Sequence, residues 1–172
     1  MEYTKMKLVK YIVTDPCYIL DDDTWKECCK VFYIYKNDEF IYQRFDEAVS
    51  KALTNLTGHQ SYACDTGFGD WCNKIYGLSV IKHDFCADAG MVCVCRLNHK
   101  VLDNLYKNNG EENALSGAAI FEMSEDIDIE FDVSNKDWTV VKIKDKQTGN
   151  IIKSMDYEDN FYDDDYEEDE EY

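Results

Sequence analysis

Residues 124–134, SEDIDIEFDVS, alternate between acidic and apolar side chains with a period of two. Successive side chains of a β-strand point to opposite faces, so this period predicts a strand over 126–133 with one buried face. The face expected toward the core consists of Ile127, Ile129, Phe131 and Val133. The opposite face consists of Asp126, Asp128, Glu130 and Asp132.

The rest of the chain predicts an α+β fold, in which an antiparallel sheet is accompanied by two N-terminal helices and an acidic C-terminal tail. The helices are expected over 21–32, which begins with capping aspartates, and over 40–56, which carries an apolar stripe. A short strand and a tight loop are expected within 57–71, and 98–113 reads as a short helix or a polar excursion. The other predicted strands are 7–14, 78–86, 91–97, 117–123, 137–145 and 151–156, with 78–86 and 91–97 forming a hairpin.

The length and composition favour one domain over 1–155, followed by a tail over 156–172. The 172 residues are 45% hydrophobic, which is enough apolar surface for a core. The first ten residues lack the apolar run of a signal peptide, and no stretch approaches the roughly 20 apolar residues that span a bilayer. We therefore expect a cytoplasmic protein.

The negative charge is concentrated in two places. The net charge is -18, yet residues 156–172 alone hold 11 acidic residues and no basic one. Residues 122–137 hold seven more acidic residues against a single lysine, Lys136, and the remainder of the chain is close to neutral. A chain with this distribution is expected to avoid bare nucleic acid and anionic membranes and to bind basic surfaces.

The row of Asp126, Asp128, Glu130 and Asp132, called the acidic row below, has two interpretations. Alternate strand residues lie roughly 6.5–7 Å apart, which is close to the spacing of phosphates along a nucleic-acid strand, so the row would suit recognition by a basic groove. Alternatively, Lys142, Lys144 and Lys146 on the next predicted strand pair with the acids, and the row is half of a salt-bridged solvated face.

Signals for chemistry are weak. The loop DTGFGDW (65–71) lacks the spacing of a phosphate-binding loop, so a structural turn is the main interpretation. With no secretion signal, the eight cysteines are expected as reduced thiols, mostly in the core. A zinc site would use His83, Cys86, Cys93 and Cys95. A thiol nucleophile would use Cys64 with His59 or His83, oriented by Asp65 or Asp88. We expect no cofactor, no metal and no catalysis.

Three segments resemble a group of small phage and prophage proteins that have no assigned chemistry. They are YIVTDPCYIL (11–20), ACDTGFGDW (63–71) and ADAGMVCV (87–94), which carry D-P-C-Y, T-G-x-G-D and D-A-G-M motifs. The resemblance implies a viral or mobile-element context, in the cytoplasm of the host cell. In charge, the chain is similar to nucleic-acid-mimic inhibitors such as anti-CRISPR and other anti-defence proteins.

These observations predict an inhibitor that occupies the basic DNA- or RNA-binding groove of a host nuclease or anti-phage complex. Its partner would be a basic nucleic-acid-binding protein, with no direct contact to nucleic acid or membrane. The expected partner-binding residues are Glu122, Glu125, Asp126, Asp128, Glu130, Asp132, Asp137, Asp163, Asp164, Asp165, Glu167 and Glu168. The alternatives are a phage assembly protein that docks through its acidic tail, and a zinc- or thiol-dependent enzyme.

Overall fold

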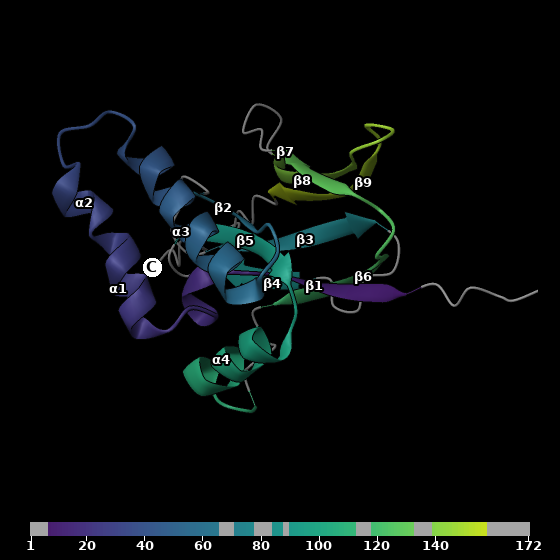
Figure 1. Ribbon diagram of the computed structural model, residues 1–172, viewed down its shortest axis with the longest axis horizontal. Coiled ribbons are helices and arrows are strands. Elements are labelled where there is room, and N and C mark those ends of the chain that lie inside the picture. Colours follow the sequence, from purple (N-terminus) through teal and green to yellow (C-terminus); the bar gives the residue numbers. More distant parts are fainter. Residues whose placement is uncertain are drawn as a thin grey trace, which may run out of the picture.

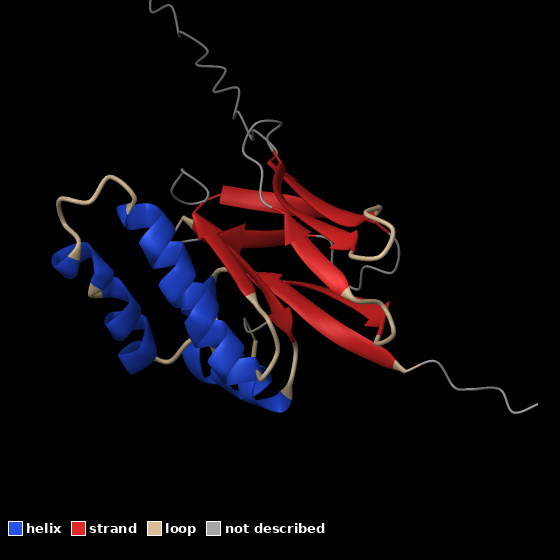
Figure 2. Cartoon of the chain, turned by 45° about the horizontal axis from the view of Figure 1, so that its top comes forward, coloured by secondary structure: helices blue, strands red, loops and turns tan. Residues whose placement is uncertain are grey.

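The computed structural model describes residues 7–65, 71–77, 84–87, 90–112, 118–132 and 139–157. For 71–77, 84–87, 139–140 and 155–157 it describes the backbone alone. These segments form two antiparallel sheets and a group of helices, so the α+β class and the antiparallel pairing predicted from the sequence are confirmed (Figures 1 and 2).

The first sheet has the strand order β2-β5-β1-β6. Its strands are β1 (Leu8–Thr14), β2 (Tyr62–Asp65), β5 (Met91–Arg96) and β6 (Ala119–Ser124). Both faces of this sheet are covered, which explains why β1 and β5 read as nearly continuous apolar runs. Ile12 and Cys93 face the helices, while Val13 and Val94 face the second sheet.

The second sheet has the order β4-β3-β9-β8-β7. Its strands are β3 (Trp71–Gly77), β4 (Asp84–Ala87), β7 (Ile129–Asp132), β8 (Thr139–Asp145) and β9 (Ile151–Tyr157). Val141 and Ile143 from β8 are buried against Phe121 of the first sheet, whose ring stacks on Tyr11 at 5.4 Å between centroids. Lys153 of β9 is also buried in this layer, with its Nζ 5.0 Å from the centre of the Phe121 ring.

The helices pack on the outer face of the first sheet, and Figure 2 shows them on the side away from the second sheet. They are the 3-10 helix η1 (Pro16–Tyr18) and the α-helices α1 (Asp22–Cys29), α2 (Val31–Ile34), α3 (Ile41–Thr57) and α4 (His99–Asn109). The apolar stripe of α3 buries Phe45, Val49 and Leu53. The molecule therefore has three layers: helices, first sheet and second sheet.

The first predicted helix is divided at Lys30 into α1 and α2. Of the two alternatives for 98–113, the helix is confirmed: this segment contains α4, which Asn98 caps by accepting a hydrogen bond from the Val101 N–H at 2.9 Å. Strand β3 was not predicted, because its mixed sequence WCNKIYG has no apolar period, and 72–77 were left between the expected loop and the next strand. The strand predicted over 151–156 is confirmed as β9, which ends one residue later, at Tyr157.

The predicted hairpin of 78–86 with 91–97 is wrong. β4 pairs with β3 in the second sheet, whereas β5 pairs with β1 and β2 in the first. A short connection such as ADAG is compatible with a tight turn between paired strands, but burial on both faces of β5 favours an internal position in the sheet that is covered on both faces. The partner of a strand is therefore decided by packing and not by proximity along the chain.

Candidate functional site

The described part of the acidic row lies at one edge of the second sheet. Ile127, Ile129 and Phe131 pack against the core between the sheets, as the alternation predicted. Regular strand structure, however, is limited to β7. Glu130 and Asp132 lie on that strand, Glu122 lies on β6, and Glu125, Asp126 and Asp128 lie in the connection between the two. Asp137, Asp163, Asp164, Asp165, Glu167 and Glu168 lie outside the described residues.

Lysines accompany most of these carboxylates. Lys144 Nζ lies 2.6 Å from an oxygen of Asp132, and Lys146 Nζ lies 3.8 Å from one of Asp128. The other two pairs are Lys7 with Glu125 at 3.0 Å and Lys10 with Glu122 at 3.9 Å. The hydrogen bond from Lys144 lowers the pKa of the Asp132 carboxyl.

Acidic and basic side chains thus lie next to one another on the outer face of the β7–β8 hairpin. In its register Glu130 lies opposite Lys144 and Asp132 opposite Lys142. This arrangement corresponds to the salt-bridged solvated face that the sequence left open. Residues 156–172, which contain no basic residue, supply 11 of the 18 units of net negative charge.

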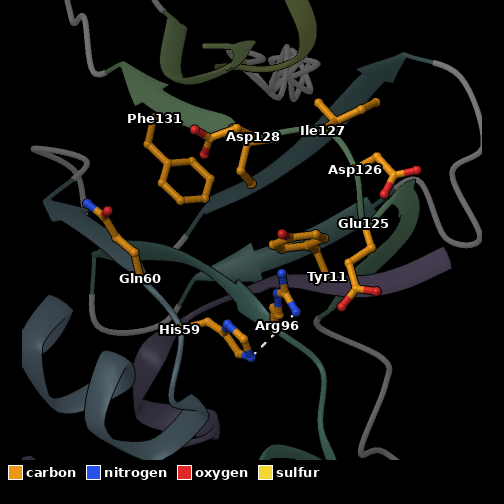
Figure 3. Close-up of a pocket in the computed structure, with 10 residues that line it drawn as sticks. Tyr11, His59, Gln60, Arg96, Glu125, Asp126, Ile127, Asp128 and Phe131 are labelled. Carbon is orange, nitrogen blue, oxygen red and sulfur yellow. Dashed lines mark hydrogen bonds between the residues drawn. The ribbon is translucent and has the colours of Figure 1, made fainter. Parts of the chain in front are cut away.

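Three of the predicted acids also line a cavity of about 260 Å³ between the two sheets (Figure 3). Arg96 and His59 lie along one side of it, with the ring of Tyr11 next to them, and Ile127, Asp128 and Phe131 lie opposite. The complete lining is Tyr11, His59, Gln60, Arg96, Glu125, Asp126, Ile127, Asp128, Ile129 and Phe131. The cavity therefore holds a cationic side and an acidic rim.

The basic side of the cavity is held by backbone structure. Arg96 is the last residue of β5 and lies opposite Tyr11 in the β1–β5 register. His59 follows Gly58, which ends α3 in the left-handed conformation with φ 72°. The buried hydroxyls of Thr57 and Ser61 donate to the His59 carbonyl at 2.9 and 3.0 Å, so the segment after the helix has little freedom.

Backbone hydrogen bonds also hold the acidic rim of the cavity in place. The Glu125 N–H donates to the Lys7 carbonyl at 2.8 Å, and the Lys146 N–H donates to the Asp128 carbonyl at 2.9 Å. Both ends of the β6–β7 connection are thereby tied to neighbouring strands. The opposing walls are joined by Tyr62 and Phe131, whose ring centroids lie 6.0 Å apart.

Arg96 was not predicted as a functional residue. A signal was present in the sequence, because Arg96 follows Val92 and Val94 on the face of β5 that points toward the second sheet. A charged residue in such an inward register position indicates either a buried partner or a ligand.

The segments with the D-P-C-Y, T-G-x-G-D and D-A-G-M motifs meet at one end of the first sheet. Thr14 pairs with Cys93, and Asp65 pairs with Met91, so the ends of β1 and β2 flank the beginning of β5. Asp15 is buried there and accepts the N–H of Cys17 at 2.9 Å, which begins η1. Residues 66–70 and 88–89 of these motifs lie outside the described residues.

The residues considered for metal or thiol chemistry are dispersed. Cys93 and Cys95 are buried beneath the helices, Cys86 lies on β4 in the other sheet, and His83 lies outside the described residues. Among the described residues no group of three or more His, Cys, Asp and Glu could hold a metal ion.

Cys64 is buried, and burial raises the pKa of its thiol, which disfavours the nucleophilic thiolate. Of its suggested partners, His59 lines the cavity and Asp65 adjoins Cys64 on β2, while Asp88 lies outside the described residues.

Comparisons with protein-family models, with curated proteins and with solved structures found no match. Within the part of the chain that the structure describes, none of the helices combines the length and the apolar character needed to cross a membrane.

Proposed function

We propose that the protein is a non-catalytic inhibitor that docks its acidic C-terminal segment into the basic nucleic-acid-binding groove of a partner protein. The observation that carries the proposal is the distribution of charge. Four carboxylates of the β6–β7 region, Glu122, Glu125, Asp128 and Asp132, have lysine partners, whereas residues 156–172 concentrate 11 acidic residues without a basic one. The resemblance to phage and prophage proteins is the reason for placing the partner in a host nuclease or anti-phage complex.

The ion-paired surface has a secondary role in this proposal. Exposed ion pairs contribute only about 0–1 kcal/mol each, so arginines of a partner can replace the lysines at little cost. Glu130 is exposed and lies at the sheet edge, where it can contact the same partner. Charge complementarity of this kind increases the association rate and makes binding sensitive to salt.

The test is capture of partners from host lysate by the tagged full chain, at about 50 and about 500 mM NaCl, with competition by DNA and RNA. Two variants accompany the wild type. In the first, the ten acidic residues of 158–172 become Asn or Gln, which retains the length of the chain and leaves β9 intact. In the second, Glu130→Lys is matched by the control Glu111→Lys, an equal charge change at an exposed site after α4.

A basic nucleic-acid-binding protein captured at low salt, displaced by nucleic acid and lost in the first variant would support the proposal. We expect weaker capture by Glu130→Lys and unchanged capture by Glu111→Lys. Capture that is insensitive to salt, or equal for the wild type and the neutralised variant, would contradict it. Capture of capsid or tail components, with a size in light scattering that grows with concentration, would favour the assembly alternative.

A further inference from the structure

Arg96 is a cation without a described counter-ion. Its Nε is buried and has no hydrogen-bond partner, and its Nη1 donates to His59 Nε2 at 3.4 Å. Within the described residues no carboxylate oxygen lies within 4.0 Å of its guanidinium, although other cations of the same surface have such partners. The Nε atom is enclosed by protein and out of reach of a ligand, but a guanidinium without a counter-ion is unfavourable, so its remaining Nη donors indicate an anionic group that is not part of the chain.

The geometry of the guanidinium restricts the ligand group. Arginine presents its N–H donors as a planar fork, which matches the two oxygens of a carboxylate. The Tyr11 ring centre lies 6.0 Å from Arg96 Cζ and limits the orientations of the fork, and His59 occupies Nη1. The remaining Nη donors are held in place by these two contacts.

The acidic rim of the cavity favours a positively charged group on the ligand. Glu125 and Asp128 are each paired with a lysine, but Asp126 has no ion pair among the described residues. A simple anion would be repelled by three nearby carboxylates, and a simple cation would be repelled by Arg96. A ligand that carries both charges complements both sides.

The size and the walls of the cavity restrict the class of ligand further. The volume of about 260 Å³ lies just below the range of about 300–1,000 Å³ that holds drug-sized molecules, so the ligand is small. Most of the accessible lining is polar, and Tyr11, Phe131, Ile127 and Ile129 contribute the smaller apolar part. The charged groups therefore dominate recognition, and the apolar part leaves room for a side group of the ligand.

We propose that this cavity binds a free α-amino acid. Its carboxylate contacts Arg96 and His59, its ammonium group contacts Asp126, and its side chain lies against Tyr11 and Phe131. This site is separate from the acidic segment of the proposed function, and the two can fail independently. Ligand binding involves neither Glu130 nor residues 158–172.

The test is isothermal titration calorimetry of the full chain with L-leucine and L-phenylalanine. Each is compared with its N-acetyl derivative, which lacks the ammonium group, and with its amide, which lacks the carboxylate. We expect at least one parent amino acid to bind, and both of its derivatives to lose about tenfold or more in affinity, because each lacks one charged contact.

The variants are Arg96→Gln, Arg96→Lys and Asp126→Asn, with Arg44→Gln as a matched control. Arg44 pairs with Asp38 at 2.8 Å and stacks on Tyr35, outside the cavity. The affinity should fall about tenfold or more in Arg96→Gln, fall less in Arg96→Lys, which retains the charge but lacks the fork, and remain unchanged in Arg44→Gln. Circular dichroism verifies that each variant is folded, and Asp126→Asn tests the rim without changing the core.

The proposal is overturned if neither parent amino acid binds at millimolar concentration, or if Arg96→Gln and Asp126→Asn both bind as the wild type does. It is also overturned if the N-acetyl derivative binds as tightly as the parent, since the site would then recognise a simple anion. Binding of a short peptide C-terminus without binding of free amino acids would assign the cavity to a protein ligand instead. Loss of partner capture in the tail variant with intact ligand binding, or the reverse, separates this site from the proposed function.

Discussion

Lys144 Nζ donates a hydrogen bond of 2.6 Å to Asp132 Oδ2 across the β7–β8 hairpin, although the backbone of Lys144 lies opposite Glu130. The ammonium group thus reaches diagonally to the next acid of the strand while remaining beside the nearer one. One lysine thereby contacts one member of the acidic row and faces a second. The charge of the row is partly compensated before any partner approaches.

Replacing Lys144 should raise the pKa of Asp132. The hydrogen bond and the charge of Lys144 hold the pKa of Asp132 below its ordinary value, so Lys144→Gln should raise this pKa toward that value. Because the folded pKa is depressed, the stabilisation by this pair is present above the unfolded pKa and is lost as the pH falls through the folded one. NMR titration of the Asp132 carboxyl carbon measures the shift, and Lys10→Gln, which alters the pair with Glu122, should leave Asp132 unchanged.

The double variant Lys144→Gln with Lys146→Gln should bind a basic partner more tightly than the wild type does. Removing these lysines releases Asp132 and Asp128 from their pairs and adds two units of negative charge to the surface. The captured fraction at intermediate salt, compared with that of Lys26→Gln with Lys30→Gln on the helical side, measures the effect. Equal capture by the two double variants would show that the hairpin face does not contact the partner.

The carboxyl group of Asp46 should make stability fall between pH 4 and pH 7. Burial, and secondly the charge of Asp65, raise the pKa of Asp46 to about 7, while the Asp65 N–H donates to its Oδ1 at 2.9 Å. The folded state therefore holds a proton that the unfolded state releases near pH 4, and its stability declines as the pH rises through this window.

Asp46→Asn retains the acceptor for the Asp65 N–H and removes the titration. The difference in free energy of unfolding between Asp46→Asn and the wild type should be about 1–2 kcal/mol more favourable to the variant at pH 8 than at pH 4. The value is this small because water still reaches the side chain. Urea unfolding at the two pH values measures it, with the exposed neighbour Glu47→Gln as control. Parallel pH profiles for the wild type and Asp46→Asn would contradict the assignment.

Two phenylalanines should differ sharply on truncation. Phe121 is fully buried between the sheets and stacks on Tyr11, so Phe121→Ala should cost about 3–5 kcal/mol through lost burial and a cavity. Phe40, before α3, is 57% exposed, and Phe40→Ala should change stability by about 0.5 kcal/mol or less. Chemical denaturation monitored by circular dichroism compares them, and similar losses would mean that the interlayer core is misplaced.

The cysteine thiols should fall into two classes by their rate of alkylation. Burial raises the pKa of Cys64 and Cys93, and both side chains are inaccessible, so alkylation should require unfolding. Cys29 is only half-buried and should react earlier, even though burial also raises its pKa. Timed labelling with iodoacetamide and peptide mass spectrometry measures each site. Labelling of Cys93 as fast as Cys29 would contradict the burial of β5.

The period of two in residues 124–134 correctly placed Ile127, Ile129 and Phe131 against the core, because the alternation of a strand is a local property of the backbone. The same reasoning identified Lys144 and Lys146 as possible partners, since they lie on the following strand. It failed for β4 and β5, which are close in the chain but belong to different sheets.

Local pattern, composition and charge were therefore determined by the sequence itself: the α+β class, the buried face of β7, and the concentration of acid in 156–172. Only the tertiary structure decided that lysines would meet the acidic row and that Arg96, His59 and Asp126 would surround one cavity. The reason is physical. Periodicity depends on neighbours along the chain, whereas the cavity depends on how two sheets stack and which edges they bring together.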